Sequence, residues 1–176
     1  MSVLFYCRYG TDPVPDLPEI GDLEVRCWLP TLDGFPPAGR KRAQNWAWLS
    51  MALLGMFSAP GFSEFSLWRD GRMMHRMIVT PRWYRFPFMD PWDLQLGDLW
   101  TAPSLRGQGV ARAAVTEVCR LHAGRSARIW FLAYSDNRAS QALAEACGFH
   151  LVGIGRRTRP LGISAIGRYR LSLSAT

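Results

Sequence analysis

The chain has 176 residues, and 48% of them are hydrophobic. A chain of this length can bury a sizeable core without disulfides, and this composition excludes an intrinsically disordered protein. The net charge of +7 lies in the second half, because residues 1–98 carry 10 basic and 11 acidic side chains and residues 99–176 carry 11 and 3.

The first part of the chain predicts an extended arm, one strand and one helix. Residues 1–22 contain three prolines and are expected to form an N-terminal arm with a short strand at Val3–Tyr9. Leu23–Leu29 alternates apolar and polar residues, which indicates a strand. A helix is expected over about Lys41–Phe57. Its apolar stretch, Trp46–Phe57, is too short to span a bilayer, which needs ~20 residues. Its expected core-facing side chains are Trp46, Leu49, Leu53 and Met56.

A hairpin and an aromatic segment come next. Phe62–Trp68 and Arg72–Thr80 flank an Arg-Asp-Gly sequence, which is typical of a hairpin turn. The segment 81–92 is aromatic and irregular, and most of its aromatic residues are expected in the core. A few could line a flat apolar pocket for an acceptor substrate. The candidates for binding that substrate are His75, Trp83, Tyr84 and Phe88.

The run Arg-Gly-Gln-Gly-Val-Ala, residues 106–111, is the most informative part of the sequence. It follows a predicted strand, Leu94–Thr101, and opens a predicted helix, Val110–His122. Its glycines let a ligand approach the backbone, and the first N–H groups of the helix have no intrahelical partner. The helix dipole adds positive potential at the same end. We therefore expect an anion here and favour a pyrophosphate.

A second motif follows about 30 residues downstream. Ile129–Tyr134 reads as a buried strand, and Asp136 or Asn137 can cap a helix over 138–147. Gly148 suits the left-handed position after a helix, and Phe149 starts another strand. Two antiparallel strands are expected after it, at 150–155 and 166–173, joined by a basic loop.

The order strand, Arg-x-x-Gly-x-Ala, helix, strand, Asn-x-x-Ser, helix, Gly-Phe resembles the GNAT superfamily of acyl-CoA-dependent N-acyltransferases. The close resemblance covers Leu96–Phe149. It implies a single α/β (α+β) domain over 1–176, with a mixed, mostly antiparallel sheet and helices on both faces. It also implies a parallel strand pair, Leu94–Thr101 and Ile129–Tyr134, whose C-terminal ends splay apart.

The resemblance implies that acetyl-CoA is the cosubstrate. The pantetheine arm would bond to the strand backbone, the pyrophosphate would sit on the glycine turn, and the helix after the second strand would contact the arm. The implied cofactor-binding residues are Leu99, Trp100, Thr101, Arg106, Gly107, Gln108, Gly109, Val110, Ala111, Asn137 and Ser140.

The implied chemistry is direct attack of an amine on the thioester. For the base we favour Asp98, followed by Asp93 and then His75, because an isolated carboxylate in an apolar strand is unexpected unless it is paired or functional. A backbone N–H near Trp100 is the expected oxyanion donor. The general acid is open. Many family members carry a Tyr where this chain has Ala144, so Cys147, Tyr134, water or the product ammonium remain candidates.

The predicted function is transfer of an acetyl group to a primary amine of a small molecule. A fainter resemblance of 85–97 to acetyltransferases of surface-glycan synthesis favours an amino sugar. A longer-chain N-acyltransferase using acyl-CoA or acyl carrier protein, and a CoA-binding module without turnover, remain alternatives. The resemblance also implies a homodimer.

The composition and the lack of certain motifs predict which partners the protein has and where it is located. The arginines are dispersed and no nucleic-acid-binding motif is present, so we expect no nucleic-acid partner. Arg8 and the acidic, proline-containing residues after it interrupt any signal peptide, and no stable membrane insertion is expected. The cysteines form no Cys-x-x-Cys pair and, with three histidines, no zinc pattern, so we expect free thiols, no metal and a cytoplasmic location. They are Cys7, Cys27, Cys119 and Cys147.

Overall fold

The computed structural model describes residues 2–19, 21–29, 42–59, 62–124, 128–163 and 167–173. Lys41 of the predicted helix and Ile166 of the predicted last strand lie outside these ranges. The strands are β1 Val3–Tyr9, β2 Glu24–Trp28, β3 Ser63–Arg69, β4 Arg72–Pro81, β5 Leu94–Thr101, β6 Arg128–Tyr134, β7 His150–Arg157 and β8 Tyr169–Leu173. The helices are α1 Arg42–Leu53, α2 Val110–Leu121 and α3 Arg138–Ala146, with short 3₁₀ turns at Pro103–Leu105 and Pro160–Gly162.

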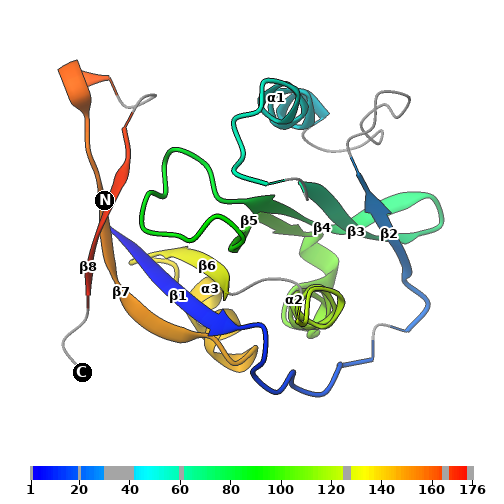
Figure 1. Cartoon of the computed structure of the whole chain (residues 1–176). Coiled ribbons are helices and arrows are strands. Elements are labelled where there is room, and N and C mark those ends of the chain that lie inside the picture. Colours follow the sequence, from blue (N-terminus) through cyan, green and yellow to red (C-terminus); the bar gives the residue numbers. More distant parts are fainter. Residues whose placement is uncertain are drawn as a thin grey trace.

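The strands form one sheet in the order β2-β3-β4-β5-β6-β1-β7-β8 (Figure 1). Among the strand pairs of the described residues, only β5–β6 is parallel, and it joins Leu94–Leu96 to Ile129–Phe131. The predicted mixed sheet with one parallel pair is therefore confirmed. The hairpin turn between β3 and β4 is also confirmed, with positive φ at Asp70 and Gly71.

The N-terminal strand differs from the expectation of an arm. β1 lies in the interior of the sheet, antiparallel to both β6 and β7, so that Val3 stands opposite Tyr134 on one side and Gly155 on the other. Its composition explains this position, because six of its seven residues are buried or partly buried. The buried Arg8 is compensated by three backbone carbonyls, among them that of Cys147 at the end of α3.

Helices cover both faces of the sheet, as predicted (Figure 1). α2 and α3 pack with the first core cluster, which includes Leu96, Phe131 and Phe149. α1 packs on the opposite face through Trp48 and Met51, against a second core cluster rich in aromatic side chains. That cluster consists of Val3, Phe5, Cys7, Trp83, Phe86, Met89 and Trp130.

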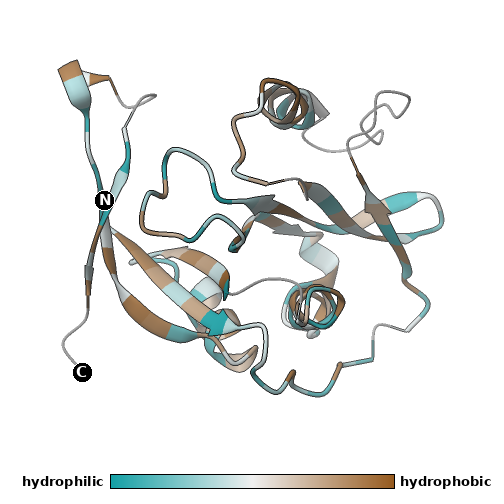
Figure 2. Ribbon diagram, viewed as in Figure 1, coloured by the Kyte–Doolittle hydropathy of each residue, from teal (hydrophilic) through white to brown (hydrophobic). Residues whose placement is uncertain are grey.

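The predicted core-facing side of α1 was wrong in part. Leu49 is buried, but Trp46 and Leu53 are 41% and 63% exposed. The helix instead buries Asn45, whose amide enters a polar network on the sheet, and this contact sets the rotation of the helix. Figure 2 shows hydrophobic residues at the end of α1 and in the segment after it. Among the described residues, no helix is long and apolar enough to cross a membrane.

Candidate functional site

The site lies where the parallel strands separate. Beyond Leu96 and Phe131 the pairing between β5 and β6 ends, although β5 continues to pair with β4 up to Thr101. β5 has a bulge where the two strands separate. Gly97 stands opposite Ile78 and Trp100 stands opposite Arg76, so β5 has two residues between these pairs where β4 has one. Asp98 in this bulge has a φ of 50°. A bulge interrupts the ladder and redirects backbone groups, which suits a strand that must present N–H groups to a ligand.

A cavity of about 640 Å³ opens between the separated strand ends, α2 and α3. We call it the thioester cleft. It brings together ten of the eleven predicted cofactor-binding residues. Its lining is Leu99, Trp100, Thr101, Leu105, Arg106, Gly107, Gly109, Val110, Ala111, Arg112, Asn137, Ala139, Ser140, Ala142, Leu143 and Ala146. The exception is Gln108, whose amide donates to the Ser104 carbonyl at 2.8 Å and ties the turn together.

The glycine turn has the geometry of an anion cradle. Gly107 and Gly109 have φ values of 76° and 78°, a region that favours glycine, and no atom lies closer than 4.0 Å to a Cβ built on either. α2 begins directly after Gly109, and its first intrahelical bond runs from the Ala113 N–H to the Gly109 carbonyl. The N–H groups before Ala113 therefore have no partner in the helix. Arg106 and Arg112 add positive charge to the same rim.

Asn137 stands on the opposite wall of the thioester cleft. Its Oδ1 accepts a hydrogen bond from the Ser140 N–H at 3.1 Å, so the predicted helix cap is confirmed. The Gln141 side chain donates to the Tyr134 and Ser135 carbonyls, which fixes the strand-to-helix turn. The start of α3 therefore faces the same cavity as the start of α2.

Asp98 belongs to a buried ionic network beneath the bulge. Its Oδ2 accepts from Arg76 at 2.8 Å, and Arg76 also pairs with Glu64 at 2.8 Å. Asn45 of α1 joins the network by donating to Glu64 and accepting from Arg76 at 2.7 Å each. The side chains of Glu64 and Arg76 are fully buried, whereas that of Asp98 is 12% exposed. Asp98 is thus the member nearest to solvent, held by an arginine that cannot move without breaking other contacts.

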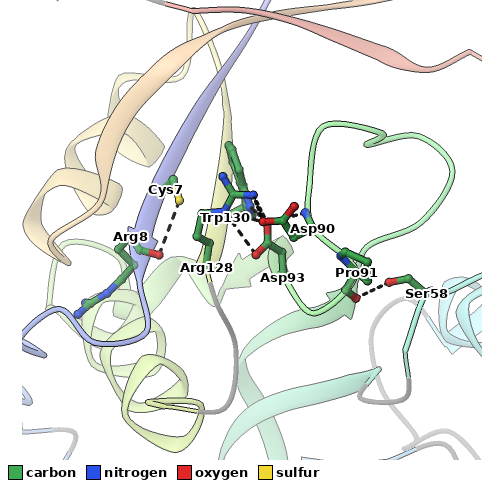
Figure 3. Close-up of polar contacts among 8 residues, drawn as sticks. All are labelled: Cys7, Arg8, Ser58, Asp90, Pro91, Asp93, Arg128 and Trp130. Atoms are coloured by element: carbon green, nitrogen blue, oxygen red, sulfur yellow. Dashed lines mark hydrogen bonds and ion pairs between the residues drawn. The ribbon is translucent and has the colours of Figure 1, made fainter.

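The other two base candidates are placed differently. His75 is fully buried, with Nδ1 2.8 Å from Thr101 Oγ1 and Nε2 without a hydrogen-bond partner, and burial lowers its pKa to about 4. Asp93 is fully buried at the start of β5, and Figure 3 shows Arg128 and Trp130 converging on it. Its Oδ2 accepts from Trp130 Nε1 at 2.8 Å and from the Asp90 N–H at 2.9 Å, so it fastens the segment before β5 to β6. We retain neither as a base.

The candidate proton donors differ in burial and position. Cys147 has no exposed surface, belongs to the first core cluster and does not line the thioester cleft, and burial raises the pKa of its thiol. Ala144 is likewise fully buried. Tyr134 ends β6 and is 49% exposed. Like Cys147, it does not line the thioester cleft.

The predicted acceptor-site aromatics lie in the second core cluster or pack against it. Trp83 is 7% exposed and contacts Trp48 and Phe86 edge-on, while Phe88 contacts Phe5 and Trp130. Tyr84, partly buried, also packs against this cluster. These rings therefore support the sheet face opposite α2 and α3.

Sequence reasoning missed the arginine and the small residues that complete the cleft. Arg112 follows the glycine turn by one helical position, and its place after the motif was the available signal. Ala139, Ala142 and Ala146 are short side chains on α3 that keep the cavity open. The described residues contain no group of His, Cys, Asp and Glu that could hold a metal ion.

Residues 19–149, most of the chain, match the sequence profile of the acetyltransferase (GNAT) family. The chain therefore belongs to the GNAT acetyltransferase family. The search of curated protein sequences found no match.

Solved structures agree on the fold. A GNAT-family protein from Novosphingobium aromaticivorans matches with a TM-score of 0.56 at 18% identity, over 87% of this chain and 60% of that one. A tandem GNAT protein from the clavulanic acid biosynthesis pathway matches with a TM-score of 0.55 at 14% identity, over 85% and 50%. A GNAT acetyltransferase from Colwellia psychrerythraea matches with a TM-score of 0.50 at 18% identity, over 85% and 52%. The chain thus spans between half and 60% of these proteins.

Proposed function

We propose that this protein transfers an acetyl group from acetyl-CoA directly to a primary amine of a small molecule. The observation that carries the proposal is the thioester cleft, where a separated parallel strand pair, a positive-φ glycine turn and the starts of two helices face one cavity. The glycine turn and Arg106 and Arg112 would hold the pyrophosphate. The edge of β5 at Leu99–Thr101, which no longer pairs with β6, would bond to the pantetheine amides.

In the proposed reaction the amine nitrogen attacks the thioester carbonyl, the C–S bond breaks and CoA leaves as a thiol. The amine loses one proton and the sulfur gains one. A backbone N–H of the bulge near Trp100 would stabilise the oxyanion. Asp98 would accept the amine proton, directly or through water, while Arg76 holds its carboxylate in place. The proton for the sulfur would come from the product ammonium or from water, because neither Cys147 nor Tyr134 lines the thioester cleft.

The first experiment measures CoA binding and turnover separately. In a thermal-shift assay, CoA should raise the melting temperature of the protein, because a ligand that binds only the folded state increases its stability. Release of free thiol from acetyl-CoA and from longer acyl-CoAs over a panel of amines then reports transfer and acyl length. Stabilisation by CoA with no turnover on any amine would favour a binding module, and no stabilisation would refute the proposal.

A matched pair of glycine variants tests the cradle itself. Gly109→Ala places a Cβ on the rim of the thioester cleft, whereas Gly71→Ala places one in the distant β3–β4 turn. Both glycines have positive φ, 78° and 69°, and no neighbour closer than 4.0 Å, so the backbone strain is similar. We expect CoA affinity to fall about 10-fold or more in Gly109→Ala only. Equal CoA affinity in the two variants would mean that the loop is only a turn.

A further inference from the structure

A second cavity of about 640 Å³ lies beside the β7–β8 hairpin and contains an excess of positive charge. We call it the arginine cavity. Its lining contains three arginines and two tyrosines but no acidic side chain. The lining residues are Ser2, Val3, Tyr134, Arg156, Arg157, Arg159 and Tyr169.

Within the described parts of the chain, no ion pair neutralises these charges. Arg156 stands directly opposite Arg170 across the β7–β8 pair, and like charges in that position are destabilising. The Nε of Arg157 is buried and has no hydrogen-bond partner. No residue after Glu145 is acidic, and none of the ion pairs among the described residues involves the arginines of the lining. An anion bound in the cavity would relieve both the repulsion and the unsatisfied donor.

The arginine cavity and the thioester cleft flank the same end of β6. Tyr134 lines the arginine cavity and Asn137 lines the thioester cleft. The Asn137 N–H donates to the Tyr134 carbonyl at 2.9 Å. The cavities lie on opposite faces of the sheet. Tyr169 packs with the second core cluster and stacks on Phe86, whereas the cleft is built on α2 and α3. Figure 1 shows the β7–β8 hairpin rising on the side that carries α1.

From this arrangement we propose that the arginine cavity binds an anionic group, a phosphate or a carboxylate, of the acceptor molecule whose amine is acetylated. The inference rests on the proposed acetyl transfer and names its substrate class. A donor entering the gap between β5 and β6 from the α2–α3 face leaves the opposite face for the acceptor. Planar guanidinium groups bind phosphate and carboxylate oxygens bidentately, and the tyrosine hydroxyls can donate to the same oxygens. Polycationic amines are expected to be poor acceptors, because the same arginines repel them.

The test compares amino sugars that differ in charge. Acetyl transfer is measured for glucosamine, glucosamine 1-phosphate, glucosamine 6-phosphate and muramic acid, the last carrying a carboxylate. We expect at least one anionic amine to have a kcat/KM about 10-fold or more above that of glucosamine. In Arg157→Gln/Arg159→Gln this preference should vanish, mainly through a raised KM, while thermal stabilisation by CoA stays the same.

Arg26→Gln is the control, because Arg26 is a half-exposed arginine on β2, at the opposite edge of the sheet from β8. Titration of the preferred anionic amine into the CoA-saturated protein, where no acetyl group is available, should show binding that the double variant loses and the control keeps. Equal use of neutral and anionic amines, or a preference that survives in the double variant, overturns the inference while leaving acetyl transfer intact. A protein that neither is stabilised by CoA nor turns over any amine refutes acetyl transfer and the inference with it.

Discussion

The buried His75 predicts a specific loss of stability in mild acid. Its side chain has no exposed surface, and burial, followed by the charge of the adjacent Arg76, lowers its pKa from the ordinary value of 6.5 to about 4. Between these two values the unfolded chain binds a proton that the folded protein does not. The stabilising contribution is therefore fully present above pH 6.5 and is lost as the pH falls towards 4. At pH 4.5 the loss amounts to about 2.5 kcal/mol, since one pKa unit is worth about 1.4 kcal/mol.

The assay is urea unfolding followed by circular dichroism at a series of values from about pH 7 to about pH 4.5. Carboxylates titrate in the same range, so the wild type must be compared with His75→Asn, which keeps a polar atom near Thr101 Oγ1 but does not titrate. The variant has lower stability at neutral pH because it leaves a small cavity. As the pH is lowered over this range, the free energy of unfolding should fall by about 2.5 kcal/mol less in the variant than in the wild type. Parallel pH profiles in the two proteins would refute the assignment of a neutral, buried imidazole.

Two further predictions concern stability and thiol chemistry. Asp93→Ala should lower the free energy of unfolding by about 3 kcal/mol in chemical denaturation, because it leaves the buried Trp130 N–H without an acceptor and removes one of the two carboxylates that pair with Arg128. A loss below ~0.5 kcal/mol would show that Asp93 does not fasten the segment before β5 to β6. A thiol reagent should label Cys27 first in the native protein, because the other three cysteines are buried and burial raises the pKa of the Cys7 and Cys119 thiols to about 12. Rapid labelling of more than one thiol before unfolding would contradict these buried positions.

Local sequence signals were enough to predict most of the elements of the sheet and the thioester cleft. The glycine turn, the cap at Asn137 and the glycine after α3 each depend on backbone requirements that one or two residue types satisfy. The hairpin at Asp70-Gly71 is of the same kind. Such signals fix where an element starts and stops, and here they also place the cleft because its walls are two strand-to-helix turns.

The rotation of α1 could not be predicted in the same way. Its apolar residues are spread around the helix, and counting them favoured Trp46 and Leu53 as the buried side. The deciding contact is polar: the Asn45 amide donates to Glu64 and accepts from Arg76. Leaving a buried ion pair with unsatisfied groups is costly, so one amide outweighs two exposed apolar side chains. A pattern that scores only hydrophobicity has no means of detecting this.

The arginine cavity depends on pairing between distant parts of the chain, and this explains why charge counting alone did not reveal it. Its walls come from the first residues, the end of β6 and the β7–β8 hairpin, and only the position of β1 between β6 and β7 brings them together. The register is tightly specified, because a Cβ on Gly155 would overlap the ring of Phe5 and a one-residue slip of β1 would turn Phe5 to the other face of the sheet. Since Val3 pairs with both Tyr134 and Gly155, that register also fixes Arg156 and Arg157 beside the end of β6. The N-terminal strand is thus the element that turns the positive charge of the second half into a localised site.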